Sequence, residues 1–372
     1  MQDPSVRLGL VGCGRIARMF HLPILHALPG ASLVAVADPD PTARSLAADQ
    51  APGALAVADV EDLLERSAID AVIVCAPTPA HADVAVTAFG AGCDVYVEKP
   101  LAAELADAQR IHAAWEASGR LGAIGFNFRF HPQVQEARRL VRDGRLGRIR
   151  AVRTVFSSPP RDLPAWKLSR GTGGGAMLDL ASHHLDLVRG LLAEEIAEVV
   201  ATAVSVGHEQ DTVQLQLRTI SGIPVQITAT QAAAQSDHVE LLGDLATVRI
   251  DRMARRRLRL DPARAPQTPP ERVRTAAHIV EEGVRATIDG LRPPSEPSFA
   301  RCLEAFVADV RRTRGTTTSD IVDRVGSCGP APGRHPGPPP RPTGASIEDG
   351  YRVAQVLDAA ERSLVTGAVT AA

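Results

Sequence analysis

The stretch VRLGLVGCGRIA, residues 6–17, decides the fold of this chain. Its first half, Val6–Val11, is an apolar run typical of a buried strand, and residues 16–28 follow with a helical pattern. The glycines therefore lie between a predicted strand and a predicted helix. In that context a G-x-G-x-x-G/A pattern predicts a turn that binds the pyrophosphate of a dinucleotide.

Each position of this motif has its own physical role. Gly12 permits the tight turn, Gly14 lets the backbone approach the pyrophosphate, and Ala17 lets the helix pack closely on the strand. The backbone amides at the start of the helix, those of Arg15 and Ile16, would hold the phosphates because the helix dipole favours negative charge there. An ordinary glycine-rich turn is the alternative interpretation.

The second predicted strand, Leu33–Ala37, ends in Asp38. A carboxylate at this point accepts hydrogen bonds from the adenosine ribose and repels a 2′-phosphate, so Asp38 favours NAD over NADP. Arg44 lies six residues further on and would partly offset that repulsion. The alternative is that Asp38 only begins a turn before Pro39.

Strand and helix patterns alternate over the first third of the chain. The predicted strands are Val6–Val11, Leu33–Ala37, Ala71–Cys75 and Asp94–Val97, and the predicted helices are Ile16–Leu28, Thr42–Asp49, Ala80–Ala91 and Ala103–Ser118. This alternation predicts an α/β Rossmann domain with a doubly wound parallel sheet over residues 1–124. One further strand, Ala123–Phe128, leads into the second region.

Residues 125–313 have a different pattern. Short strands follow one another, at Arg148–Ser157, Ala197–Val206, Thr212–Thr219, Pro224–Thr230, His238–Leu242 and Ala246–Ile250. A helix is expected among them, from the loop Gly171–Gly175 to about Leu192. The pattern predicts an α+β domain with a mainly antiparallel open sheet.

The last part of the chain contains two unusual segments. Arginines crowd residues 252–264, which we interpret as a solvated strand edge and loop. Seven of the thirteen residues from Pro330 to Pro342 are proline, so residues 314–345 are predicted to form a flexible insertion. Residues 346–372 follow as a helix that begins at a capping box of Ser346 and Asp349 and packs back on the body.

Composition excludes several classes of function. The 372 residues suggest two domains, and 41 basic against 43 acidic residues do not favour binding to nucleic acid or to an anionic membrane. No apolar run approaches the roughly 18 residues of a membrane span, and no signal peptide pattern is present. Five scattered cysteines indicate neither a disulfide framework nor a zinc site. We therefore expect a soluble cytoplasmic protein without a metal.

Four more motifs follow the glycine-rich turn. They are APTPAH at 76–81, EKP at 98–100, GFNFRF at 125–130 and GGGAMLDLASH at 173–183. With residues 12–17 they resemble the Gfo/Idh/MocA family of sugar and cyclitol oxidoreductases, in family order and at family-like spacing. The resemblance covers most of the chain except about residues 314–341, which resemble an insertion relative to the family.

The resemblance implies a nicotinamide dinucleotide in the first domain and a substrate on the sheet of the second. It also implies that Lys99, Asp179 and His183 match the family's catalytic residues. Thr78, His81 and Glu98 align with positions near the nicotinamide in relatives, and Ala76 and Lys99 are further cofactor-binding candidates. Members of the family are often dimers or tetramers, so a homodimer or homotetramer is expected.

The chemistry of hydride transfer explains these residue types. Removing a hydride from an alcohol carbon requires that a proton leave the oxygen, so the protein must supply an acid/base group. Asp179 and His183 are four residues apart on one predicted helix and share a face, which lets the carboxylate orient the imidazole. A surface salt bridge is the alternative. His184 is expected to be structural, and Asp186 is a second candidate for the orienting carboxylate.

Lysine is rare in this chain, which makes each lysine informative. Of the 41 basic residues, only Lys99 and Lys167 are lysines, and the others are arginines. An ammonium can polarise an oxygen and pass a proton, whereas a guanidinium keeps its proton. We therefore expect Lys99 to be catalytic and to bind substrate, together with His183. Lys167 and Asn127 are further substrate-binding candidates, although Asn127 and Arg129 could equally be structural.

These patterns predict an NAD(P)-dependent oxidoreductase. It would transfer a hydride between nicotinamide and a secondary alcohol or ketone of a sugar, a cyclitol or a nucleotide-activated sugar. Two alternatives stay open, because the family also contains glycosidases that use NAD for transient oxidation and non-catalytic dinucleotide-binding regulators. Such a regulator needs no acid/base residues, so Lys99, Asp179 and His183 favour an enzyme.

Overall fold

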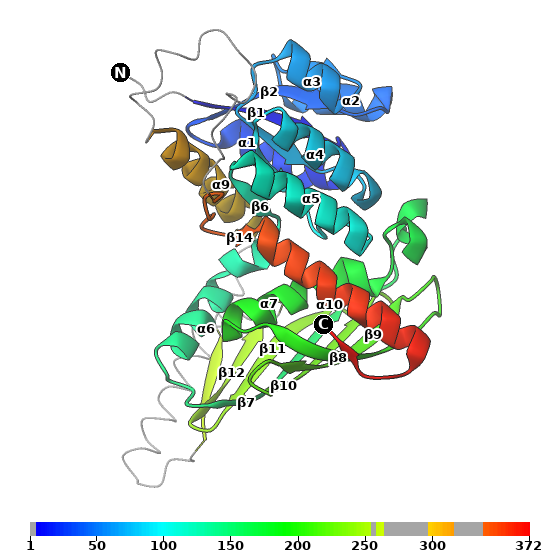
Figure 1. Ribbon diagram of the computed structural model, residues 1–372, viewed down its shortest axis with the longest axis vertical. Helices are drawn as coiled ribbons and strands as arrows, with labels where there is room; N and C mark the ends of the chain where they lie inside the picture. Colours follow the sequence, from blue (N-terminus) through cyan, green and yellow to red (C-terminus); the bar gives the residue numbers. More distant parts are fainter. Residues whose placement is uncertain (1–4, 254–257, 264–296, 316–337) are drawn as a thin grey trace. The chain divides into compact units, whose positions relative to one another are not determined.

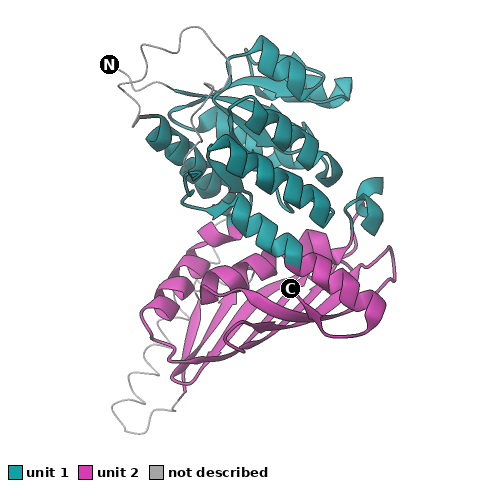
Figure 2. Ribbon diagram, viewed as in Figure 1, with its two compact units in different colours: residues 1–127, 165–174, 298–355 teal, residues 128–164, 175–297, 356–372 magenta. Residues whose placement is uncertain are grey.

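A computed structural model describes residues 5–253, 258–263, 297–315 and 338–372 (Figure 1). The chain divides into two compact units, shown in Figure 2. Unit 1 comprises residues 1–127, 165–174 and 298–355, and unit 2 comprises residues 128–164, 175–297 and 356–372. This division differs from the continuous ranges expected from the sequence, since two later segments join the first unit.

Unit 1 is built on a parallel sheet. Within the described residues the strand order is β14-β6-β5-β4-β1-β2-β3, and only β14 runs antiparallel to its neighbour. The strands are β1 (Val6–Val11), β2 (Ala31–Ala37), β3 (Leu55–Val57), β4 (Ala71–Val74), β5 (Asp94–Val97), β6 (Gly122–Ile124) and β14 (Ala345–Ser346). The predicted doubly wound Rossmann fold is confirmed.

The helices of unit 1 connect these strands. They are the π-helix η1 (Ala17–His21), α1 (Leu22–Ala27), α2 (Pro41–Gln50), α3 (Val60–Arg66), η2 (Thr78–Ala80), α4 (His81–Gly90), α5 (Leu105–Ser118), η4 (Ala165–Lys167), η5 (Arg170–Thr172), α9 (Ser298–Gly315) and the first part of α10 (Ile347–Thr366). The start of α2 is set by Asp40, whose carboxylate accepts a hydrogen bond from the amide of Thr42 at 2.9 Å.

Unit 2 is built on a second sheet with the order β13-β12-β11-β7-β10-β9-β8-β15. Its strands are β7 (Ile149–Ser157), β8 (Ile196–Val204), β9 (Thr212–Thr219), β10 (Pro224–Thr230), β11 (Ser236–Gly243), β12 (Ala246–Asp251), β13 (Arg259–Pro262) and β15 (Thr370–Ala371). Among the described strands of this sheet, only β7 and β10 pair in parallel, so the predicted mainly antiparallel sheet is confirmed.

Alternation along β9 explains why one face of this sheet is covered. Val213, Leu215 and Leu217 are buried, whereas the polar residues between them are exposed. The helices α6 (Pro132–Arg142) and α7 (Ser182–Leu192) lie over the sheet, and the π-helix η6 (Met177–Ala181) leads into α7 (Figure 1). A short 3₁₀ turn, η3 (Asn127–Phe130), precedes α6.

Several predicted elements need correction. The expected regular helix over 16–28 is a π-helical turn followed by the short α1, and the strand expected at 123–128 ends at Ile124. The sequence patterns did not predict β3, α3, α6 or α9. Strand β3 has only three residues, too few to show a period, and its place depends on pairing with β2.

The predicted insertion at 314–345 lies mostly outside the described residues. Its two described ends belong to the fold of unit 1, because Arg314 pairs with Asp70 at 2.7 Å and the hydroxyl of Thr343 donates to Asp309 at 2.8 Å. The capping box that follows is confirmed, since the amide of Asp349 donates to the hydroxyl of Ser346 at 3.2 Å.

The interpretation of residues 252–264 as a solvated edge was wrong for Arg252. Its side chain is 2% exposed and pairs with the fully buried Asp237 at 2.9 Å. Residues 254–257 and 264 lie outside the described residues. None of the helices in the described ranges is both long enough and apolar enough to span a membrane.

Candidate active site

The glycine-rich turn has the shape that a dinucleotide needs. Gly12 has a φ of +94°, and a Cβ added to it would lie 2.2 Å from the amide nitrogen of Ala76, so only glycine fits there. Beside Gly14 a Cβ would meet nothing within 4 Å, which leaves open space next to the backbone. Ala17 is fully buried, as close packing of the helix on the strand requires, and the role of Gly14 toward the pyrophosphate stays a prediction.

The helix after this turn begins with a π-helical segment, η1. The amides of Arg15 and Ile16 precede it, in the first turn, where backbone N–H groups have no partner within the helix. These are the amides that the sequence predicts to bind phosphate oxygens, and that assignment stays a prediction. Short π-helical turns are rare and occur often at functional sites. Here the turn ends at His21, a residue that the sequence did not single out.

Asp38 lies directly beside the glycine-rich turn. Its Oδ2 accepts a hydrogen bond from the amide of Cys13 at 2.7 Å, and its Oδ1 accepts one from the amide of Asp40 at 2.9 Å. These bonds fix the carboxylate at the end of β2, where a ribose would be bound. The guanidinium of Arg44 donates to the backbone carbonyl of Asp38 at 2.6 Å, so this cation also lies at the same strand end.

His81 connects two loops of unit 1. Its Nε2 lies 2.9 Å from the carbonyl oxygen of Ala76, and its Nδ1 lies 3.0 Å from that of Pro100. Burial lowers the pKa of His81, although these carbonyl groups act in the opposite direction. His81 thus holds the loop after β4 against the loop after β5. Thr78, which begins η2 between them, is buried as well.

Glu98 and Lys99 follow β5. Oε1 of Glu98 lies 2.8 Å from Nε2 of His21, and its Oε2 accepts a hydrogen bond from the amide of Lys99 at 3.2 Å. Burial raises the pKa of Glu98, but the hydrogen bond from His21 and the charge of Lys99 outweigh it, so this pKa lies below its ordinary value. The half-buried Lys99 is therefore attached at its backbone to an ionised carboxylate.

Asp179 belongs to unit 2 and lies in the π-helix η6. Its Oδ2 accepts a hydrogen bond from the side-chain amide of Gln231 at 2.9 Å, and the guanidinium of Arg161 lies 3.8 Å away. Gln231 is the first residue after β10 and is buried. The sequence did not single out Gln231, although its place directly after a predicted strand was a usable signal.

His183 lies in the first turn of α7. Its ring stacks on the ring of Phe128, with centroids 4.0 Å apart and an interplanar angle of 11°. His184 is structural, as predicted, because it is fully buried and its Nε2 lies 3.3 Å from Oδ1 of Asp237. Asp186 pairs with Arg129 at 2.6 Å, so the structure shows Arg129 in a structural ion pair.

The two remaining candidates for substrate binding lie in unit 1. The side-chain amide of the buried Asn127 donates to the hydroxyl of Ser298 at 2.9 Å, which is a structural use. The Nζ of Lys167 lies over the ring of Trp166, 5.3 Å from its centroid, in the 3₁₀ turn η4. Both assignments to substrate binding stay predictions.

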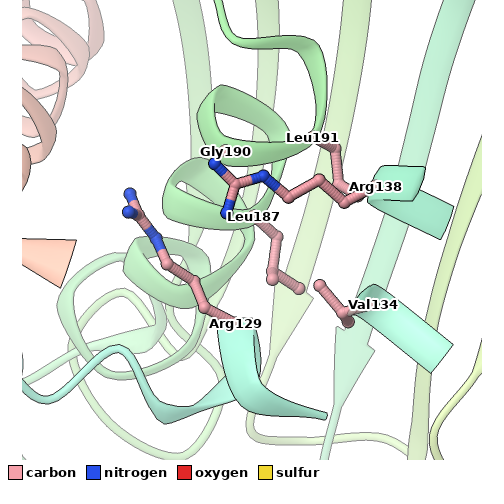
Figure 3. A pocket seen from close by; sticks show the side chains of 6 residues that line it. All are labelled: Arg129, Val134, Arg138, Leu187, Gly190 and Leu191. Atoms are coloured by element: carbon pink, nitrogen blue, oxygen red, sulfur yellow. The ribbon is translucent and has the colours of Figure 1, made fainter. Parts of the chain in front are cut away.

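A shallow, open hollow lies elsewhere in unit 2 (Figure 3). It is lined by Arg129, Val134, Arg138, Leu187, Gly190 and Leu191, from η3, α6 and α7. Neither Asp179 nor His183 is among these residues. In the described ranges, no group of three or more His, Cys, Asp or Glu side chains is placed to hold a metal ion.

Comparison with known proteins shows that both parts of the chain match domains of one protein family. The NAD-binding Rossmann fold of the oxidoreductase family GFO_IDH_MocA matches residues 6–126, and the GFO/IDH/MocA C-terminal domain matches residues 134–249. Inositol 2-dehydrogenase of Rhizobium meliloti (strain 1021) is 34% identical over 241 residues, which are 62% of this chain and 70% of that protein. The dTDP-3,4-didehydro-2,6-dideoxy-alpha-D-glucose 3-reductase of Streptomyces antibioticus is 28% identical over 333 residues, 87% of this chain and 94% of that enzyme.

Solved structures agree on the fold. The WlbA dehydrogenase from Bordetella pertussis, crystallised with NADH and UDP-GlcNAcA, has a TM-score of 0.76 at 23% identity and covers 100% of this chain and 99% of its own. The apo scyllo-inositol dehydrogenase from Lactobacillus casei has a TM-score of 0.74 at 19% identity, with 100% and 99% covered. The two matched domains and the sequence relatives agree with the motifs found in the sequence. The chain belongs to the GFO/IDH/MocA oxidoreductase family.

Proposed function

We propose that this protein is an NAD(P)-dependent oxidoreductase that acts on a secondary alcohol or ketone of a sugar, a cyclitol or a nucleotide-activated sugar. The relatives named above act on inositol and on a dTDP-linked sugar, which supports this substrate class. The observation that carries the proposal is the arrangement around Asp179 and His183. A carboxylate held by Gln231 and an imidazole held by Phe128 lie in consecutive turns of η6 and α7.

The residues of unit 1 fit a dinucleotide. Gly12 and Gly14 leave room for the pyrophosphate, the amides of Arg15 and Ile16 would bind its oxygens, and Asp38 would accept hydrogen bonds from the ribose. When bound, the nicotinamide ring accepts or donates the hydride. Ala76, Thr78, His81 and Glu98 would surround that end of the cofactor, with His81 and Glu98 acting by fixing the loops on which Lys99 lies.

The proton of the substrate hydroxyl would be transferred by His183, with Asp179 and Lys99 assisting. In our proposal, His183 accepts the proton of the substrate hydroxyl during oxidation and returns it during reduction. Asp179 stabilises the imidazolium that forms, and the ammonium of Lys99 polarises the same substrate oxygen. A positioned acid/base group of this kind contributes about 10²- to 10⁴-fold to the rate.

Three finer assignments accompany this proposal. Asp38 supports a preference for NAD over NADP. The family resemblance supports a homodimer or homotetramer. We further propose that the enzyme works in the cytoplasm, where the dinucleotide is available.

A screen for hydride transfer tests the function. The purified protein is incubated with NAD or NADP and a panel of inositols and aldoses, or with NADH and keto sugars, while absorbance at 340 nm is recorded. We expect a change with at least one substrate, and a loss of about 10²-fold or more in the His183→Gln variant. Tight NAD binding without any absorbance change over the whole panel would contradict an oxidoreductase and favour a regulator.

A further inference from the structure

The ring of Phe128 lies between a guanidinium and the imidazole of His183. Cζ of Arg252 is 3.1 Å from the centroid of this ring, and the imidazole centroid is 4.0 Å from it at an angle of 11°. One face of a phenyl ring has no room for both groups at these distances, so they cover opposite faces. Arg252, Phe128 and His183 therefore form a three-layer stack inside unit 2.

A buried ion pair holds the far end of this stack. Nη1 of Arg252 donates to Oδ2 of Asp237 at 2.9 Å, and Nε2 of His184 lies 3.3 Å from Oδ1 of the same carboxylate. Burial raises the pKa of Asp237, but the hydrogen bond from His184 and the charge of Arg252 outweigh it, so this pKa lies below its ordinary value. The carboxylate is thus ionised, and it fixes the guanidinium in place.

The contacts form a closed ring of side chains. The ring of His184 stacks on Phe156, with centroids 5.3 Å apart at an angle of 18°, and Phe156 also contacts the ring of His183 at 6.1 Å. Starting from His183, contacts lead through Phe128, Arg252, Asp237, His184 and Phe156 back to His183. Such a closed set restrains the plane of every ring in it.

We propose that Arg252 is a positioning residue for His183, and that it also sets the basicity of this imidazole. The inference rests on the proposed function, in which His183 carries the proton. Through the Phe128 ring, Arg252 fixes the plane of the imidazole. Its positive charge disfavours the imidazolium, which keeps His183 able to accept a proton near neutral pH.

Other charged groups of unit 2 act on the same imidazole. Asp179, on η6, favours the imidazolium, and Arg161, from the segment after β7, weakens that effect by pairing with Asp179. Asp237 on β11 offsets part of the charge of Arg252 and interacts with His184 and with His131 at the start of α6. In our proposal, the opposed effects of the Asp179 carboxylate and the Arg252 guanidinium set the proton affinity of His183.

Three variants separate these effects. Arg252→Met removes the cation, Arg252→Lys keeps the charge without a planar group, and Phe128→Leu removes the ring in the middle of the stack. Arg189→Met is the matched control, because Arg189 also is a buried arginine of unit 2 that pairs with a carboxylate, Glu195, at 2.7 Å. Melting temperatures of all four variants report the loss of stability separately.

The main measurement does not depend on the substrate. In full-length protein with NAD and ¹⁵N-labelled histidine, NMR follows the ring of His183 against pH, and its signal is assigned by its loss in His183→Gln. We expect Arg252→Met to raise the pKa of His183 by about 1, the scale of a nearby charge at intermediate dielectric. Arg252→Lys should leave this pKa within about 0.3 of wild type, and Arg189→Met should not change it.

Kinetics test the positioning. With myo-inositol as the probe, or another substrate from the screen, we expect Arg252→Lys and Phe128→Leu to lower kcat about 10-fold with little change in KM, as misplacement of an acid/base group does. A wild-type pKa of His183 in Arg252→Met and a wild-type kcat in both other variants would overturn the inference. If Arg252→Met does not fold, a wild-type kcat in Arg252→Lys and Phe128→Leu overturns it alone. Full activity of His183→Gln would instead overturn the proposed function.

Discussion

Nε2 of His21 lies 2.8 Å from Oε1 of Glu98, and this buried pair joins the helix after the glycine-rich turn to the loop that carries Lys99. The other oxygen of Glu98 accepts a hydrogen bond from the amide of Lys99 at 3.2 Å. The turn for the dinucleotide and the candidate catalytic lysine therefore share one carboxylate. A change at Glu98 should affect stability and the position of Lys99 together.

Glu98→Gln should destabilise the protein by about 2 kcal/mol at pH 7, the scale of a lost hydrogen bond to a charged group. Because the folded state lowers the pKa of Glu98, the carboxylate contributes stability above its unfolded pKa of about 4.3 and loses it as the pH falls through the lower folded value. The difference in free energy of unfolding between wild type and variant should thus have its full size at pH 7 and become smaller below about pH 4. Urea unfolding at both pH values measures it.

Asp83→Asn is the control for this experiment. Asp83 pairs with Arg110 at 2.7 Å, but its side chain is 77% exposed. An exposed ion pair contributes little, so this variant should stay within about 0.5 kcal/mol of wild type. If Glu98→Gln were as stable as Asp83→Asn at pH 7, the buried pair would not contribute as we expect.

The sequence predicted the elements whose determinants are local. The turn at Gly12 was predictable because the motif, the strand before it and the helix after it are contiguous, and the same holds for the capping box at Ser346. Arg252 was not predictable. It stands in an arginine-rich segment, and its burial depends on Asp237 in strand β11 and on Phe128 far earlier in the chain. No local pattern distinguishes it from its neighbours.

The same argument applies to the candidate site. Asp179 and His183 were found from their spacing, but the spacing gave no information on the π-helical turn that contains Asp179. Gln231 directly follows β10 and reaches Asp179, in η6, only through the fold. His21 was missed because its partner, Glu98, lies in another motif of the sequence. Partners across long sequence separations are what the structure adds.

Asp38→Ser should weaken the use of NAD and improve the use of NADP as cofactor. The change removes a ribose acceptor and the negative charge that repels a 2′-phosphate, while Arg44 stays at the same strand end. We expect the ratio of kcat/KM for NAD to that for NADP to fall by roughly 10- to 100-fold, since hydrogen bonds to charged groups contribute about 1.5–3 kcal/mol. Initial rates with each cofactor measure this ratio.

Asp40→Ser provides the matched control. Asp40 is the N-cap of α2, and serine is an equally good N-cap, so α2 should persist. This variant removes one nearby negative charge without touching Asp38. The cofactor ratio should stay within about threefold of wild type, which corresponds to less than 1 kcal/mol. A similar ratio in both serine variants would contradict the role of Asp38.

Gln231→Leu should lower kcat by about 10-fold. The change removes the amide that donates to Asp179 at 2.9 Å and lets this carboxylate move relative to His183. Gln226→Leu, on the exposed face of the same strand, is the control and should keep wild-type kcat. Steady-state kinetics of both variants at saturating cofactor are decisive, and equal kcat values would show that Gln231 does not orient Asp179.

Lys99→Arg should bind cofactor almost normally and lose most of its turnover. Arginine keeps the positive charge, so an attraction that depends on charge alone should survive. It cannot give up its proton at accessible pH, and its wider planar group displaces the substrate oxygen. We expect kcat to fall by roughly 10²- to 10⁴-fold, with the Kd for NAD from fluorescence titration changed less than about threefold.

Lys99→Met separates the size of the side chain from its proton chemistry. Methionine is similar in length to lysine but uncharged, so it fits the site without displacing substrate. If the ammonium polarises the oxygen or passes a proton, Lys99→Met should lose as much kcat as Lys99→Arg. If the defect of arginine is only its size, methionine should retain clearly more activity. Near-wild-type kcat in both variants would show that Lys99 is not catalytic, and its rarity in an arginine-rich chain would then carry no functional information.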